Sequence, residues 1–211
     1  MINRTELQAR SIPLLLTGYG GLLFIAVFTT LGYVAHPYHA LKDAISTLEV
    51  TQYGPVQQAN FVLFGVLLCL FAWALRRELQ SGWGALAIPL FQIVAGLGVI
   101  GDGFFLWPTA LHMVCALIAF NAALCVLFCF AWRVRHDIRW RGWATFSSLT
   151  AVATMAFLFC FGMMNNVGGP AGLMEKMATV VRTVWSVALV TRLLSGVSLA
   201  PAGDALAAKA R

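Results

Sequence analysis

Charged residues are scarce in this sequence. Only 10% of the 211 residues are Asp, Glu, Lys or Arg, and 60% are hydrophobic, whereas a typical soluble domain carries about 25% charged residues. The mean hydropathy is +0.82, and the apolar residues form long runs, so lipid is the expected solvent for most of the chain. This composition excludes a soluble globular domain. The length suits one membrane bundle with no separate domain beside it.

Several motifs of soluble enzymes and binding proteins are also missing. The sequence has no GxSxG, no HExxH and no glycine-rich phosphate loop. The five cysteines form no CxxC pair, and because they all lie in apolar runs we interpret them as packing residues. The formal net charge is +6. We attribute it to cations at helix ends and predict no nucleic-acid partner.

Six apolar segments are long enough to cross a hydrocarbon core of about 30 Å at a helical rise of about 1.5 Å per residue. The sequence therefore predicts an all-α, polytopic membrane bundle, a single integral membrane domain over residues 1–211. The first apolar run is about twice the usual 7–15 residues of a signal-peptide core, so we expect it to be retained. The spans are predicted at about 12–35, 59–75, 83–105, 109–132, 142–164 and 172–196, with a frayed tail over 197–211.

The polar segment 36–58, between the first two spans, has a helical pattern of its own. Apolar residues at i, i+3, i+4 and i+7 predict a short amphipathic helix lying at the membrane interface. These residues are Leu41, Ala44, Ile45 and Leu48, and the opposite face collects His36, His39, Asp43 and Ser46.

The cations are distributed unevenly between the two sides of the predicted bundle. With a cytoplasmic N-terminus, the outer side holds only Lys42 and Lys176. This asymmetry predicts that both termini are cytoplasmic. The expected partners are membrane lipids, with self-association or a membrane partner protein left open. The inner side would hold Arg4, Arg10, Arg76, Arg77, Arg133, Arg135, Arg139, Arg141, Arg192, Lys209 and Arg211.

The last span carries a charge near its middle, at Arg182. An arginine at that depth costs about 2.5–3.5 kcal/mol on insertion scales, so it should face a protein interior with a polar partner. The simplest arrangement is a salt bridge from Arg182 to Asp102 or Asp43. Helical spacing places four polar residues on one narrow face of this span, namely Glu175, Thr179, Arg182 and Ser186.

Polar residues gather in the outer half of the predicted bundle and its loops. They either fix helix packing or line a polar pocket open to the outer leaflet. Gln92 and Asn121 lie nearer the middle of the membrane, where we expect hydrogen bonds between helices. The candidates for the pocket are Arg182, Asp102, His112, Asp43, His39, Ser46, Asn60 and Glu175.

Three functions are compatible with such a pocket. The leading hypothesis is a non-enzymatic protein that binds a lipid headgroup or small amphiphile, with no cofactor and no assigned catalytic residue. The first alternative is a metal-dependent membrane hydrolase acting on a lipid, because imidazoles and a carboxylate can hold zinc. A small transporter is the other alternative, although no inverted repeat or broken helix supports it. The metal set would be His36, His39, Asp43 and His112.

Three passages together resemble the bacterial membrane proteins of domain-of-unknown-function family 998. They are Ala44–Gly65, the glycine-rich third span leading to His112, and Gly172–Leu194. The first contains Ile-Ser-Thr-Leu and Gln-Gln-Ala-Asn-Phe, and the last has Gly-Leu at its start but Lys176 where the family pattern has arginine. The resemblance implies six spans and a location in the inner (plasma) membrane of a bacterium, and it supplies no activity. The outer loop between spans three and four is shorter than usual, which puts a family-wide pocket in that loop in doubt.

Overall fold

The structure is a computed structural model that describes residues 12–200, and its secondary structure over that range is helical. The first span, Ile12–Val34, contains the short 3-10 helix η1 (Thr17–Tyr19) and α2 (Gly20–Val34). Next come η2 (Ile45–Val50), α3 (Gly54–Leu79), α4 (Ala87–Phe104), α5 (Ala110–Val134), η3 (Ile138–Trp140), α6 (Trp143–Asn166) and α7 (Ala171–Leu194).

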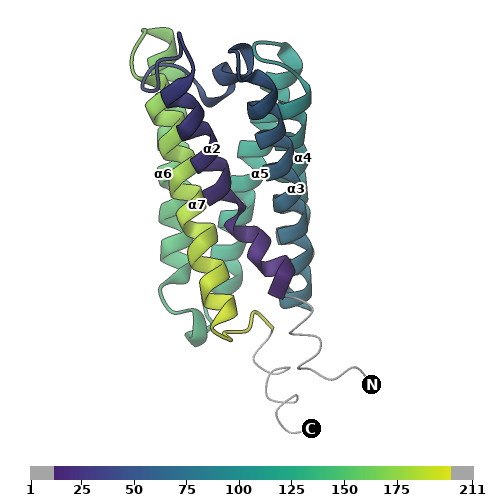
Figure 1. Cartoon of the computed structure of the whole chain (residues 1–211). Helices are drawn as coiled ribbons and strands as arrows, with labels where there is room; N and C mark the ends of the chain where they lie inside the picture. The colour runs from purple at the N-terminus through teal and green to yellow at the C-terminus, as the bar shows by residue number, and fades with distance from the viewer. Residues whose placement is uncertain (1–11, 201–211) are drawn as a thin grey trace, which may run out of the picture.

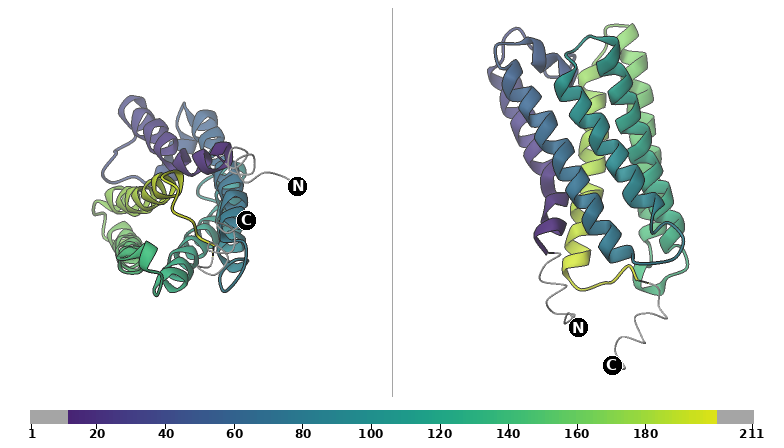
Figure 2. Two further views of the ribbon diagram at one scale, coloured as in Figure 1. Left: turned by 90° about the horizontal axis from the view of Figure 1, so that it is seen from below. Right: turned by 90° about the vertical axis from the view of Figure 1, so that its right-hand side faces the viewer.

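The long helices form a closed ring (Figures 1 and 2). Each packs against its neighbour in the sequence, and α2 closes the ring by packing against both α3 and α7. The start of the first span and the end of α7 lie at the same end of the ring, here called the terminal end (Figure 1). The opposite, distal end carries η2 and the turns between α4 and α5 and between α6 and α7.

All six predicted spans are helices long and apolar enough to cross a membrane. Large apolar side chains cover the outside of the ring: Leu97, Leu117 and Phe159 are 56%, 59% and 71% exposed. Such surfaces suit acyl chains, whereas in water they would form an unusually large exposed apolar area. The protein is therefore a multi-pass membrane protein with an all-helical bundle fold.

Two apolar clusters fill the ring near its ends. Phe71, Phe130 and Trp185 belong to the cluster toward the terminal end, where the Trp185 indole N–H donates a 2.9 Å hydrogen bond to Ser147 Oγ. Phe28 and Leu48 belong to the distal cluster. The space between these clusters holds the cavity described below.

Glycines allow the close contact between α3 and α4. A Cβ atom on Gly65 would lie 2.5 Å from the carbonyl oxygen of Gly96, and one on Gly96 would lie 2.7 Å from that of Gly65. The two backbones therefore touch with no room for a methyl group. Small residues thus let the glycine-rich third span pack closely against α3.

The segment between the first two spans differs from the amphipathic helix predicted within 36–58. Residues 35–44 form turns and irregular backbone, the helical part is only the 3-10 helix η2, and α3 begins already at Gly54. The predicted apolar face holds in part, because Ile45 and Leu48 are buried but Leu41 is 61% exposed. The irregular backbone is stabilised by bonds to α7, which local periodicity does not reveal.

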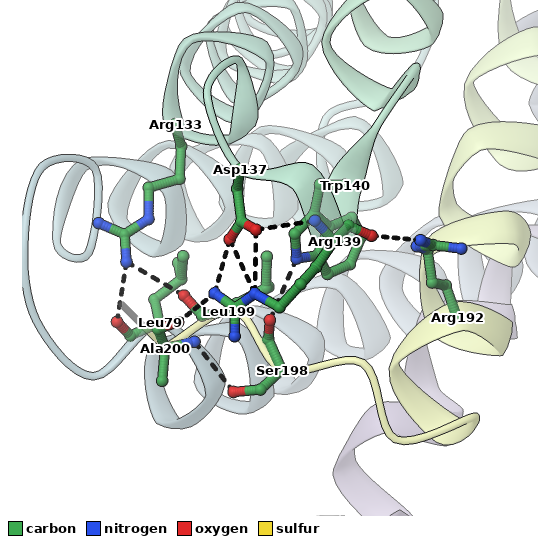
Figure 3. A network of polar contacts seen from close by, with 9 residues as sticks. All are labelled: Leu79, Arg133, Asp137, Arg139, Trp140, Arg192, Ser198, Leu199 and Ala200. Carbon is green, nitrogen blue, oxygen red and sulfur yellow. Dashed lines mark hydrogen bonds and ion pairs between the residues drawn. The ribbon is translucent and has the colours of Figure 1, made fainter. Parts of the chain in front are cut away.

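The end of the described chain is held in place, contrary to the frayed tail predicted from residue 197. Leu199 is buried, and its carbonyl accepts from Arg133. Arg139 Nη2 donates to the Ala200 carbonyl at 2.7 Å and also pairs with Asp137, to which Arg139 Nε donates as well (Figure 3). These bonds fasten the segment after α7 to the α5–α6 loop. Residues 201–211, the rest of the predicted tail, lie outside the described range.

Candidate functional site: a charged cavity inside the ring

A cavity of about 140 Å³ lies inside the helical ring. Its walls come from all six long helices and η2, and most of the lining side chains are apolar, including Phe24, Phe64, Leu68 and Phe120. Polar groups interrupt this apolar wall at a few positions. Five of the eight residues proposed from the sequence line it: Ser46, Asp102, His112, Glu175 and Arg182.

The polar face predicted on the last span is turned to this cavity. Glu175, Thr179, Arg182 and Ser186 all line it. Four positions spaced by three or four residues share one side of a helix, and here that side is the inner side of the ring. α7 therefore brings both an acidic and a basic group to the same enclosed space.

Arg182 does not form the salt bridge predicted with Asp102 or Asp43. Its two terminal nitrogens donate to Ser186 Oγ at 2.6 Å and to the side-chain oxygen of Gln92 at 2.9 Å. Among residues 12–200, no carboxylate oxygen lies within 4.0 Å of the guanidinium. Asp102 lies nearer the distal end of α4, and Asp43 lies in the distal loop. The guanidinium is held by neutral dipoles and keeps its full charge.

Two further contacts define the surroundings of this guanidinium. Its carbon lies 5.0 Å from the centre of the Trp185 ring, a distance typical of a cation–π contact. The Nε atom of Arg182 and the amide nitrogen of Gln92 are buried donors with no hydrogen-bond partner in the described part of the chain. The prediction of an interhelical bond for Gln92 is confirmed. Asn121 instead bonds to Leu117 on its own helix, so that prediction was wrong.

Acidic groups occupy the distal part of the cavity. Asp102 is 5% exposed, and its Oδ1 atom has no hydrogen-bond partner within residues 12–200. Glu175 accepts a 2.7 Å hydrogen bond from the backbone N–H of Ile45, which fixes the start of η2. No lysine or arginine nitrogen in the described range lies within 4.0 Å of either carboxyl group.

His112 faces Glu49, a residue that the sequence analysis did not single out. The His112 Nδ1 atom is 3.6 Å from Glu49 Oε2 and 2.8 Å from the Phe105 carbonyl oxygen. Because a carbonyl only accepts, Nδ1 must carry a proton. Glu49 also accepts from the Trp107 N–H at 2.9 Å, so it connects η2 to the α4–α5 turn. The only feature of the sequence that could have indicated Glu49 is its position directly after the apolar Leu48.

Glu49 lies in η2, outside the membrane-spanning helices, and its side chain is fully buried. Burial raises the pKa of its carboxyl group from 4.5 to about 7, although the hydrogen bond from Trp107 acts in the opposite direction. Burial and the nearby Glu175 and Asp43 carboxylates also raise the pKa of Tyr38 above its ordinary value. Glu49 and Tyr38 are thus shielded from water at the distal end.

Three of the eight candidates lie away from the cavity. His39 is exposed, and its backbone N–H donates to Asp43 Oδ2 at 2.6 Å. Asn60 is buried but donates to the Phe24 carbonyl, which joins α3 to α2. These residues therefore stabilise a turn and a helix contact.

The alternative metal set is not assembled. His36 and His39 are both exposed, whereas His112 is buried against Phe105 and Glu49. Within the described residues, no group of three or more His, Cys, Asp or Glu side chains is close enough to hold a metal ion. The hypothesis failed because the predicted helix that would align His36, His39 and Asp43 does not form.

The start of α7 holds the distal loop, residues 35–44, in place through a set of hydrogen bonds, here called the clasp. The Lys176 ammonium group donates to the carbonyl oxygens of Ala40, Asp43 and Gly172. The backbone N–H groups of Gly172 and Leu173 donate to the backbone carbonyl oxygens of Lys42 and Leu41, respectively. A Cβ atom on Gly172 would lie 2.0 Å from the Asp43 carbonyl oxygen, so this approach requires glycine. The clasp fixes the loop that leads into η2, the element that carries Ser46 and Glu49.

The comparisons with known proteins give one match. The family described as "Protein of unknown function (DUF998)" matches residues 19–192, a range that contains every cavity-lining residue except Gly18. The chain belongs to this family. The resemblance inferred from the sequence motifs is thereby confirmed. The family description assigns no activity, and no curated protein or solved structure matches the chain.

Proposed function

We propose that this DUF998 protein binds an amphiphile in its central cavity and holds the polar, acidic group of that molecule at Arg182. The observation that supports this proposal is that the guanidinium of Arg182, near the middle of its span, lines the cavity and forms hydrogen bonds only to neutral groups. A buried ion without a counter-charge costs several kcal/mol, and a carboxylate or phosphate from a ligand would offset that penalty. The free Nε donor of Arg182 gives such an anion a further hydrogen bond.

The apolar walls support an amphiphile over a free inorganic anion. Side chains such as Phe24, Phe64 and Phe120 line the cavity beside Arg182, and they are poor neighbours for a fully hydrated ion. An acyl or alkyl chain would bury apolar area against them, at about 25 cal/mol per Å². A lipid or fatty acid from the surrounding bilayer has both parts.

We further propose that both chain termini face the cytoplasm and that the distal end faces the outside of a bacterial inner membrane. The support is the crowding of arginines at the terminal end, including Arg76, Arg135 and Arg141, all of which are exposed. A C-terminal alkaline phosphatase fusion should be inactive, and one placed in the turn at residues 167–170 should be active. The reverse pattern would overturn this orientation.

Native purification tests the binding proposal. The wild-type protein, Arg182→Gln and the exposed control Arg141→Gln are purified in mild detergent, and their bound amphiphiles are extracted and identified by mass spectrometry. We expect wild type and Arg141→Gln to retain an acidic amphiphile and Arg182→Gln to retain about tenfold less, the loss expected from one weakened ion pair. Equal retention by all three proteins would refute the proposal. Arg182→Lys, which preserves the charge, should recover part of the retention.

A further inference from the structure

One guanidinium and two carboxyl groups line the cavity without contacting each other. Arg182 bonds to Gln92 and Ser186, whereas Asp102 and Glu175 have no cationic partner in the described chain. Lys176 is the cation next to Glu175 in the sequence, but its ammonium group is turned to three backbone carbonyls of the clasp. The guanidinium and the two carboxyl groups therefore reach the cavity without forming an ion pair within residues 12–200.

Helix geometry keeps these charges apart. Glu175 and Arg182 are seven residues apart on α7, which corresponds to about 10 Å along the helix axis. Arg182 also bonds toward Ser186, away from Glu175. On α4, Asp102 lies ten residues from Gln92, the residue that holds the guanidinium, or about 15 Å along that axis. The basic and acidic levels of the cavity are thus separated on both walls.

Apart from Thr179, whose hydroxyl donates to the backbone carbonyl of Glu175, the wall between the two levels is apolar. Ala178 lies between Glu175 and Arg182 on α7, and Val99 lies between Gln92 and Asp102 on α4. Both residues line the cavity, and Phe24 and Phe64 complete this part of the wall. A ligand that reaches from one level to the other must present a hydrocarbon segment to these side chains.

We propose that Asp102 and Glu175 form a second subsite, for an ammonium group, and that the ligand is a zwitterionic amphiphile whose acidic and basic groups are about 10 Å apart. The proposal rests on the proposed function, since Arg182 holds the acidic end. Asp102 supplies the observation independent of Arg182: it is 95% buried, lines the cavity, and has an oxygen without a hydrogen-bond partner in the described residues. An ammonium group donates three hydrogen bonds and satisfies this oxygen together with Glu175.

Matched short-chain probes test the spacing. Purified protein in lipid nanodiscs is titrated by calorimetry with octanoate, octylamine and ω-aminooctanoate, whose two charges are similarly far apart when the chain is extended. Butanoate and ω-aminobutanoate form a shorter pair. We expect ω-aminooctanoate to bind about tenfold more tightly than octanoate. The amino group should bring no gain in the shorter pair, because it cannot reach from Arg182 to the carboxyl groups.

Variants test which residues cause the tighter binding of ω-aminooctanoate relative to octanoate. Asp102→Asn and Glu175→Gln should each remove most of the preference for ω-aminooctanoate, measured in each variant as the ratio of its dissociation constants for octanoate and ω-aminooctanoate. The loop control Asp43→Asn should preserve this ratio. Equal binding of octanoate and ω-aminooctanoate by the wild type, or a preference that survives in both variants, would overturn the second subsite alone. Octanoate binding that is undiminished in Arg182→Gln would overturn the proposed function. Melting curves of each variant verify folding before titration.

Discussion

The Arg182 guanidinium on α7 donates a 2.9 Å hydrogen bond to the side-chain oxygen of Gln92 on α4, and the two residues are 90 positions apart in the sequence. Gln92 is fully buried, and its amide nitrogen has no partner among the described residues. This neutral amide orients the only charge found near the middle of α7 and leaves that charge uncompensated. It also makes position 92 a sensitive place to test the site.

Replacing Gln92 with glutamate should supply the missing counter-charge from within the protein. We expect Gln92→Glu to reduce octanoate binding by more than about tenfold, since the ligand anion must then compete with an internal ion pair. Thermal stability should be unchanged or higher. Calorimetric titration and melting curves measure the two effects. Undiminished binding with an intact fold would contradict the assignment of Arg182 as the anion site.

Removing the same side-chain oxygen should weaken the bundle. Gln92→Leu eliminates a hydrogen bond to a charged group, and such bonds contribute about 1.5–3 kcal/mol to stability. The expected result is a lower free energy of unfolding with retained helical content, measured by denaturant titration in mixed micelles. Asn121→Leu is the matched control, because Asn121 bonds within its own helix and is exposed, so its replacement should have little effect.

The contact between α3 and α4 should not tolerate a methyl group. In Gly65→Ala, the new Cβ would meet the Gly96 carbonyl oxygen at 2.5 Å, so the helices must separate, with an expected loss of about 1–3 kcal/mol. Gly162→Ala on α6 is the control, because no atom lies within 4 Å of the added carbon. Its stability should stay equal or rise slightly with the better helix propensity of alanine. Similar losses in both variants would show that the close contact is not responsible.

The distal clasp should open when Lys176 loses its ammonium group. Lys176→Met leaves the carbonyl oxygens of Ala40 and Asp43 without this donor, so we expect faster hydrogen exchange in residues 36–44. Mass spectrometry of the exchanged peptides reads out the effect. Lys42→Met changes an exposed side chain of the same loop and should leave exchange unaltered. Equal exchange in wild type and Lys176→Met would exclude the clasp as the element that holds the loop.

Glu49 should make stability depend on pH. Its pKa is about 7 in the folded protein against 4.5 when unperturbed, so the folded state binds more protons in between. The resulting stabilisation is fully present below pH 4.5 and is lost as the pH rises through about 7. Wild type should therefore melt at a lower temperature at pH 8 than at pH 5. In Glu49→Gln, the melting temperature should depend less on pH. A variant whose melting temperature changes with pH as in the wild type would refute the role of Glu49.

The sequence by itself determined the membrane class, the six spans and the family, because long apolar runs and short local motifs carry that information without tertiary contacts. It also placed Glu175 and Arg182 on one face of the last helix, since helical periodicity is local. Only the tertiary structure decided the partner of Arg182, which is Gln92 rather than Asp102 or Asp43. Pairing across the ring depends on the depth and rotation of α4 relative to α7, and neither is encoded in spacing along one chain segment. The same reason applies to Glu49 and to the irregular loop before it: bonds from α7 and from the α4–α5 turn outweigh the weak helical pattern of residues 41–48.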